Sequence, residues 1–196
     1  MVMHYDDLPR GIHIALGGAP MYEVVDSSFD AAILLGHLAM AGVERGVMAH
    51  TFSSLTIENI LLNGRRIGEI AIEALWLGSF GIPVVMVSAD EDGCSEARDW
   101  LGEVETAPTK RGLGTHRAIS LHPADACDLI RARAAAAIAR LDDFTPFVPP
   151  PPYELQFDCY TEEQARIRYA KLDGRAEMIG PRSFLLRGQK PLDLVW

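Results

Sequence analysis

Two histidines and one glutamate have the chemistry and the position expected of a reactive site: His37, His50 and Glu69. Glu69 follows Gly68 at the start of a segment whose other residues are mostly apolar. A carboxylate on a buried helix is costly unless it is paired, hydrogen-bonded or bound to a metal, and such positions often serve a site. The alternative is a first-turn acid stabilised by the helix macrodipole, with Glu73 as a solvated neighbour one turn later.

Each histidine can be interpreted as functional or as structural. His37 follows the apolar run 31–35, at the place where ligands gather in open α/β sheets. His50 closes a second short apolar run. Their separation of thirteen residues matches no recognised metal-binding spacing. Each is therefore either a catalytic or metal-binding side chain or a hydrogen-bonded structural histidine.

Two further motifs favour ordinary structure over chemistry. The glycine-rich stretch 111–114 lacks the strand-turn-helix frame of a phosphate loop, so a turn is predicted there. The acidic run 90–92 follows a buried strand and is interpreted as a solvated loop rather than a cation site.

The elements that position these residues predict an α/β fold, a central sheet with flanking helices. Continuous apolar runs at 31–35 and 83–89 are typical of strands buried on both faces. Asn63-Gly64 predicts a hairpin between 57–62 and 65–67. Helices are predicted over 68–78, over 94–101 and after Pro123, the last with Ala126, Ile130, Ala134, Ile138 and Leu141 on its inner face.

A proline-rich segment divides the chain. Residues 144–153 include four consecutive prolines and predict an extended connector between an α/β body (1–143) and a smaller β-rich lobe (154–196). The lobe has the pattern β-α-β-β, with a strand over 154–160, strands over 176–179 and 183–187, and a helix opened by the capping box of Thr161 and Gln164.

Composition excludes several classes of protein. The chain has 196 residues, 48% of them hydrophobic, and a net charge of −9, which suits a globular protein and disfavours nucleic acid as a partner. The apolar runs are far shorter than the roughly 20 residues of a membrane span, and no secretory signal is evident. Three dispersed cysteines predict reduced thiols and a cytoplasmic location.

The order of three stretches adds a family resemblance: LLGHLAMAGVERGVMAHT, LLNGRRIGE and GIPVVMVSADED. Together they resemble the D-aminopeptidase family of zinc peptidases, and the similarity continues through TKRGLGTHRAISLHP to the β-rich tail. The resemblance implies an α/β body with a second lobe, zinc as cofactor, and release of N-terminal D-residues, D-Ala especially, from short peptides. It also implies a homo-oligomer, since the family forms decameric rings.

The resemblance assigns roles to individual residues. The zinc-binding glutamate of the family's G-E motif matches Glu69, and the catalytic histidine of its G-V-x-x-H motif matches His50. The family's G-x-H-A metal histidine falls on Leu38, so His37 is a candidate ligand only if the loop 36–42 is shifted by one residue. The family opens with an Asp-x-Glu metal motif and has an Asp-Ser-His motif later, and this sequence contains neither; the resemblance suggests that it starts just after the opening motif.

Two functions follow from this pattern. The first is a D-aminopeptidase-like metallohydrolase with His50 acting on substrate, impaired by its incomplete ligand set. The alternative is a non-catalytic relative that binds a small ligand or serves a structural role. Because a catalytic zinc takes about three protein ligands, we expect the chain to bind zinc poorly.

Overall fold

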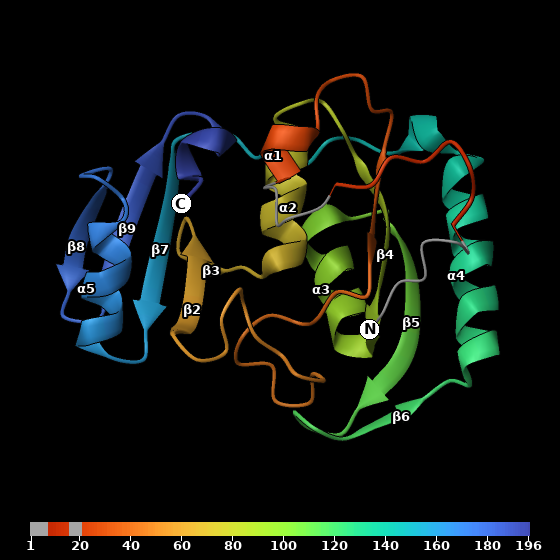
Figure 1. The fold of residues 1–196 in the computed structure, drawn as a ribbon, viewed down its shortest axis with the longest axis horizontal. Helices are drawn as coiled ribbons and strands as arrows, with labels where there is room; N and C mark the ends of the chain where they lie inside the picture. Colours follow the sequence, from red (N-terminus) through yellow and green to blue (C-terminus); the bar gives the residue numbers. More distant parts are fainter. Residues whose placement is uncertain (1–7, 16–20) are drawn as a thin grey trace.

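Two sheets with a helix between them form the fold, which is of the predicted α/β class (Figure 1). The computed structural model describes residues 8–15 and 21–196. The first sheet has the strand order β1-β4-β5-β6 and the second the order β3-β2-β7-β9-β8. The strands of the first sheet are β1 (Ala32–Leu35), β4 (Val84–Asp90), β5 (Glu105–Gly112) and β6 (Ala118–Ser120). Those of the second are β2 (Ile57–Leu62), β3 (Arg65–Arg66), β7 (Tyr153–Cys159), β8 (Ala176–Gly180) and β9 (Ser183–Gly188). The helices are α1 (Met21–Val24), α2 (Glu69–Gly78), α3 (Glu91–Leu101), α4 (Pro123–Ile138) and α5 (Glu162–Ala170).

The first sheet is parallel from β1 through β4 to β5, and β6 runs antiparallel to β5. Strand β4 is buried along its whole length, as predicted. A strand forms at 31–35 as predicted, but its predicted burial on both faces is wrong, because β1 lies at the end of the described sheet. Its Leu34 is buried, but Leu35 is 62% exposed and Ile33 is 38% exposed. An apolar run shows what a strand is able to bury, and the neighbouring elements decide what it does bury.

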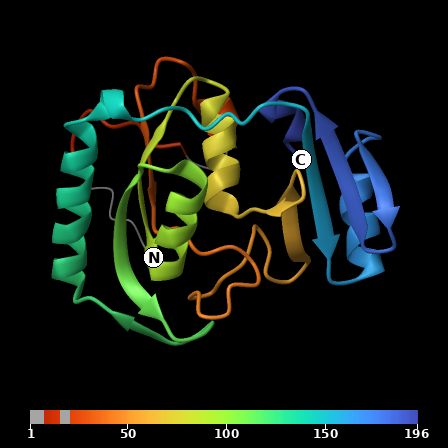
Figure 2. The same cartoon turned by 180° about the vertical axis from the view of Figure 1, so that it is seen from behind.

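Helix α2 lies between the two sheets, as Figures 1 and 2 show, and all of its residues except Glu69 and Glu73 are buried. Ile72, Leu75 and Trp76 pack into the core of the second sheet. Ile70 and Leu77 pack on the other side, into the core formed with β1, β4 and α3. This double burial confirms the predicted helix and fixes its orientation, so the first residue of α2 has a defined place in the fold.

The hairpin of β2 and β3 forms as predicted, with Asn63 at φ 49° and Gly64 at φ 80°. These are the left-handed conformations that a two-residue hairpin turn requires. The hairpin then pairs antiparallel with β7, so the second sheet takes strands from both sides of the proline-rich segment. Strands β7, β8 and β9 and helix α5 occur where the sequence predicts, and Thr161 and Gln164 form the capping box. The division into lobes at 144–153 stays a prediction.

Helix α4 covers the opposite face of the first sheet, at the end of the molecule away from the second sheet (Figure 2). Ala137 packs against Val85, Met86 and Ala107. The predicted inner face is wrong at Ile138. Its side chain is 59% exposed, and the neighbouring Ala137 is buried against the sheet instead. No helix within the described residues has both the length and the apolarity to cross a membrane.

Candidate functional site

The three candidate residues meet at one hollow. His37, His50 and Glu69 line a cavity of about 200 Å³ together with Leu35, Gly36 and Leu38. The cavity lies at the carboxyl end of β1, where ligands bind in open α/β sheets. The backbone N–H of His37 donates to the carbonyl of Ser88 on β4 (2.9 Å), which ties the loop after β1 to the neighbouring strand.

His50 faces Glu69 across this hollow. The Nε2 atom of His50 lies 3.9 Å from Oε1 of Glu69. Its Nδ1 atom lies 2.7 Å from the carbonyl oxygen of Met48, which can only accept a hydrogen bond. That bond assigns the proton to Nδ1, so in the neutral ring Nε2 carries the lone pair that faces the site.

Glu69 is the first residue of α2, where the helix macrodipole favours an acid. Its Oε1 atom also accepts the backbone N–H of Phe52 at 2.5 Å. The structural role and the proposed functional role therefore coincide in one side chain. The carboxylate joins the start of the helix to the segment that carries His50.

His37 faces Glu73, the residue one turn after Glu69 on α2. Its Nε2 atom is 3.4 Å from Oε2 of Glu73. Burial, together with the nearby Glu69 carboxylate, raises the pKa of Glu73 to about 7. Burial lowers the pKa of His37, against the opposing effect of Glu69. Both changes favour the neutral forms, in which the Glu73 carboxyl holds its proton and the His37 ring holds no extra one. Glu73 is thus a half-buried partner of His37, not the solvated neighbour of the alternative interpretation.

Two buried acids hold the loop between His37 and His50. Asp90 is 1% exposed, and its Oδ2 accepts the backbone N–H of Val47 (2.6 Å) while its Oδ1 caps α3 at Gly93 (2.8 Å). Glu96 is 5% exposed, and its Oε2 accepts the N–H of Met40 (2.7 Å). The solvated loop predicted at 90–92 is wrong, because Asp90 is the buried N-cap of α3 and the next two acids form its first turn.

The backbone on both sides of His50 is strained. Met48 and Phe52 have φ values of 54° and 57°, in the left-handed region that side chains other than glycine rarely adopt. Such conformations persist only where the surroundings impose them. The N–H of Met48 donates to the carbonyl of Thr115, and the N–H of Phe52 donates to Glu69, so each strained residue is held by a bond to another element.

The structure supplies roles that the sequence pattern missed. Glu73 has helical spacing from Glu69, and this spacing alone places both carboxylates on one face of α2. The sequence position of Asp90, between a buried strand and a helix, is typical of an N-cap and could have predicted this role. Glu96 had no such signal, because its partner Met40 lies 56 residues away in the chain.

Glu96 makes the stability of the protein depend on pH. Its pKa is raised to about 7, mainly by burial. The folded state therefore holds the proton of Glu96 more tightly than the unfolded chain does. As the pH rises from about 4.5 to about 7, the unfolded chain loses this proton first, so the free energy of unfolding falls. Glu96→Gln removes the ionisable carboxyl. We expect the variant's free energy of unfolding to decrease over this pH range by about 1–3 kcal/mol less than that of the unmodified chain. Urea unfolding at several pH values measures the slope; Glu91→Gln, on the exposed start of α3, is the control. An unchanged slope in Glu96→Gln would contradict the assignment.

The chain belongs to the D-aminopeptidase family, whose model matches residues 3–193. The D-aminopeptidase of Bacillus subtilis (strain 168) is 30% identical over 146 residues, which are 74% of this chain and 53% of the relative. The chain thus spans about half the length of this curated relative. A solved structure, described as the Zn-dependent D-aminopeptidase DppA from Bacillus subtilis, a self-compartmentalizing protease, is 25% identical with a TM-score of 0.86. That match covers 97% of this chain and 69% of the other.

Proposed function

We propose that this chain is a peptide hydrolase that releases N-terminal D-residues from short peptides. The observation that carries the proposal is the meeting of His50 and Glu69 at one hollow, in a chain that belongs to the D-aminopeptidase family. The activity named for both relatives supports the same reaction. These relationships favour the hydrolase over the non-catalytic alternative.

His50 is the residue that acts on substrate in this proposal. With Nδ1–H donated to Met48, its Nε2 atom is free to take a proton from an attacking water and to return one to the leaving amine. Glu69, 3.9 Å away, stabilises the ring while it carries the positive charge. Leu35 and Leu38 form an apolar wall, and a hollow of about 200 Å³ suits a small side chain such as the methyl group of D-Ala.

The described residues do not by themselves fit a tightly held catalytic zinc. Such an ion takes about three protein ligands and a water. Within 8–15 and 21–196, no three His, Cys, Asp or Glu side chains gather closely enough to hold a metal. Glu69 and His37 remain the proposed ligands, and Leu38 lines the hollow without a donor atom. Activity is therefore expected to depend on zinc added to the buffer.

Dipeptide pairs of opposite chirality test the function directly. With excess zinc present, we expect hydrolysis of D-Ala-D-Ala at a rate below the roughly 10 s⁻¹ of a typical enzyme, and none of L-Ala-L-Ala. Comparison of D-Ala-L-Ala with L-Ala-D-Ala shows whether the enzyme recognises the chirality of the first or of the second residue. The proposal would be overturned if the chirality of the second residue decided which dipeptide is cleaved. It would also be overturned if neither D-Ala-D-Ala nor D-Ala-L-Ala were hydrolysed.

We also propose a cytoplasmic homo-oligomer. Exposed apolar side chains support self-association, among them Leu35 at 62% and Met48 at 54% exposure beside the candidate site. The description of the structural relative as self-compartmentalizing points the same way. Light scattering at micromolar concentration is expected to give a mass well above the 21.5 kDa of one chain, and a mass of one chain would contradict the assembly.

A further inference from the structure

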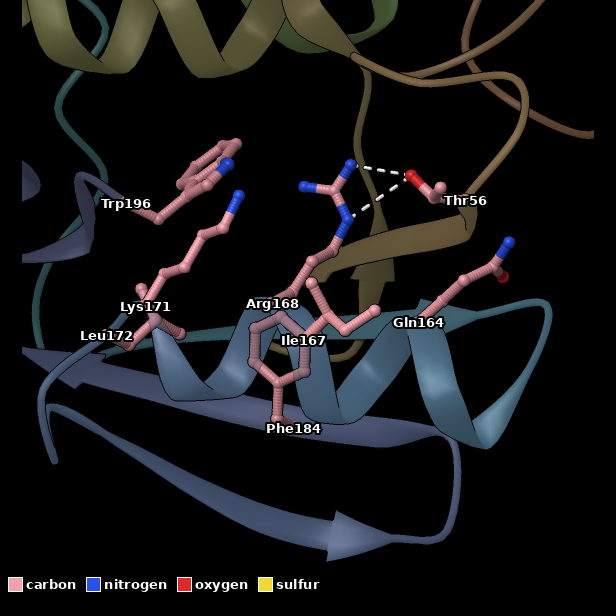
Figure 3. Close-up of a pocket in the computed structure, with 8 residues that line it drawn as sticks. All are labelled: Thr56, Gln164, Ile167, Arg168, Lys171, Leu172, Phe184 and Trp196. Atoms are coloured by element: carbon pink, nitrogen blue, oxygen red, sulfur yellow. Dashed lines mark hydrogen bonds between the residues drawn. The ribbon is translucent and has the colours of Figure 1, made fainter.

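A second hollow, away from His50 and Glu69, lies beside α5 in the second sheet's half of the molecule. It has a volume of about 400 Å³, within the range of small-molecule sites. Figure 3 shows the side chains that line it, which come from α5 and the two residues after it, from β9, from the residue before β2 and from Trp196. None of the residues given a role in the proposed peptidase lines this hollow.

The floor of the hollow is apolar and firmly packed. Leu172 and Phe184 are 3% and 2% exposed. The ring of Trp196 makes edge contacts with Phe157 (4.7 Å between centroids) and Phe52 (4.9 Å). Aromatic contacts of this kind hold the Trp196 ring in place, so one wall exists before any ligand binds.

Two cations stand over this apolar floor without a carboxylate partner. Arg168 is in the last turn of α5 and Lys171 is the C-cap of that helix, and neither forms an ion pair with an acid in the described part of the chain. Arg168 donates through Nε and Nη2 to the hydroxyl of Thr56, at 3.2 Å and 2.6 Å. Its other terminal nitrogen has no hydrogen-bond partner among residues 8–15 and 21–196, and Figure 3 shows it turned toward the side where Lys171 runs beside Trp196.

We propose that this hollow binds a monocarboxylate with an apolar body, its carboxylate between Lys171 and Arg168 and its hydrocarbon part against Leu172, Phe184 and Trp196. Arginine and lysine together neutralise a carboxylate, and desolvation by the apolar walls strengthens the charged hydrogen bonds. The net charge of −9 repels polyanions, whereas a single carboxylate adds one charge beside two cations. The C-terminus of a short peptide that ends in an apolar residue has this chemistry.

The probe is 3-phenylpropanoate, with 3-phenylpropanamide as its uncharged match; neither contains a cleavable peptide bond between residues. Binding to the full chain is followed by tryptophan fluorescence, because Trp196 lines the hollow. We expect a dissociation constant of about 1 mM or lower for the acid and a value at least about tenfold higher for the amide. Lys171→Met keeps the apolar stem, and it should weaken binding of the acid about fivefold. The matched control is Arg166→Met, on the same helix but paired with Glu162 outside the hollow.

Several results would overturn the proposal. They are equal binding of acid and amide, no binding of the acid, or an undiminished affinity in Lys171→Met. Displacement by inorganic phosphate as effectively as by the acid would show a general anion site, which also contradicts it. Loss of binding in His50→Gln would place the probe at the peptidase site instead. Because Lys171 is exposed, its replacement should leave thermal unfolding unchanged, and that measurement accompanies the titration.

Discussion

His50→Gln is expected to lower the turnover of D-Ala-D-Ala about a hundredfold in buffer with excess zinc. The strained residues Met48 and Phe52 keep the bonds that hold them, to Thr115 and to Glu69, because neither bond involves the side chain of residue 50. Glutamine cannot take up a proton at the position of Nε2, which is the function assigned to the ring. The loss should appear in kcat with KM little changed, since the transition state is affected more than ground-state binding.

The control for this variant is His116→Gln, an exposed histidine outside the hollow. Its turnover should equal that of the unmodified chain. Full activity in His50→Gln, or a loss confined to KM, would contradict the role of His50 as the proton carrier.

Asp90→Ala is expected to lower the free energy of unfolding by about 2–4 kcal/mol. The variant removes the acceptor of two backbone N–H groups, those of Val47 and Gly93, and leaves both without their partner. It also removes the N-cap of α3. Because the bond to Val47 fixes the loop that carries His50, activity should fall together with stability.

Urea unfolding measures this change, with Glu91→Ala as the matched control on the first turn of the same helix. Glu91 is exposed and the control should cost less than about 0.5 kcal/mol. Equal stability of the two variants would show that Asp90 does not hold the loop.

Local patterns predicted the elements that position the site. The apolar run before Asp90 predicted β4, the Asn63-Gly64 pair predicted the hairpin, and the spacing of apolar residues after Gly68 predicted α2. Each of these depends on interactions within a few residues of the chain. For the same reason the sequence placed Glu69 at the start of a buried helix, which the structure confirms.

The arrangement of these elements depended on distant partners and was not predictable from local patterns. Strand β2 pairs with β7 across the proline-rich segment, and no sequence pattern in either strand identifies the other as its partner. The apolar run of β1 looked like a central strand, although the described sheet ends there. The pairing of His37 with Glu73 likewise required the fold, because it joins a loop to a helix 36 residues later in the chain.

Zinc content is the most direct test of the central claim, which is a D-aminopeptidase-type site with an incomplete set of metal ligands. The protein is incubated with zinc, desalted and submitted to elemental analysis, alongside Glu69→Ala. We expect less than about 0.1 zinc per chain in both proteins, because a tightly held catalytic ion takes about three protein ligands and the described residues bring no such group together. About one zinc per chain that is retained after desalting and lost in Glu69→Ala would contradict this account, since it would mean that His37 or another side chain completes the site.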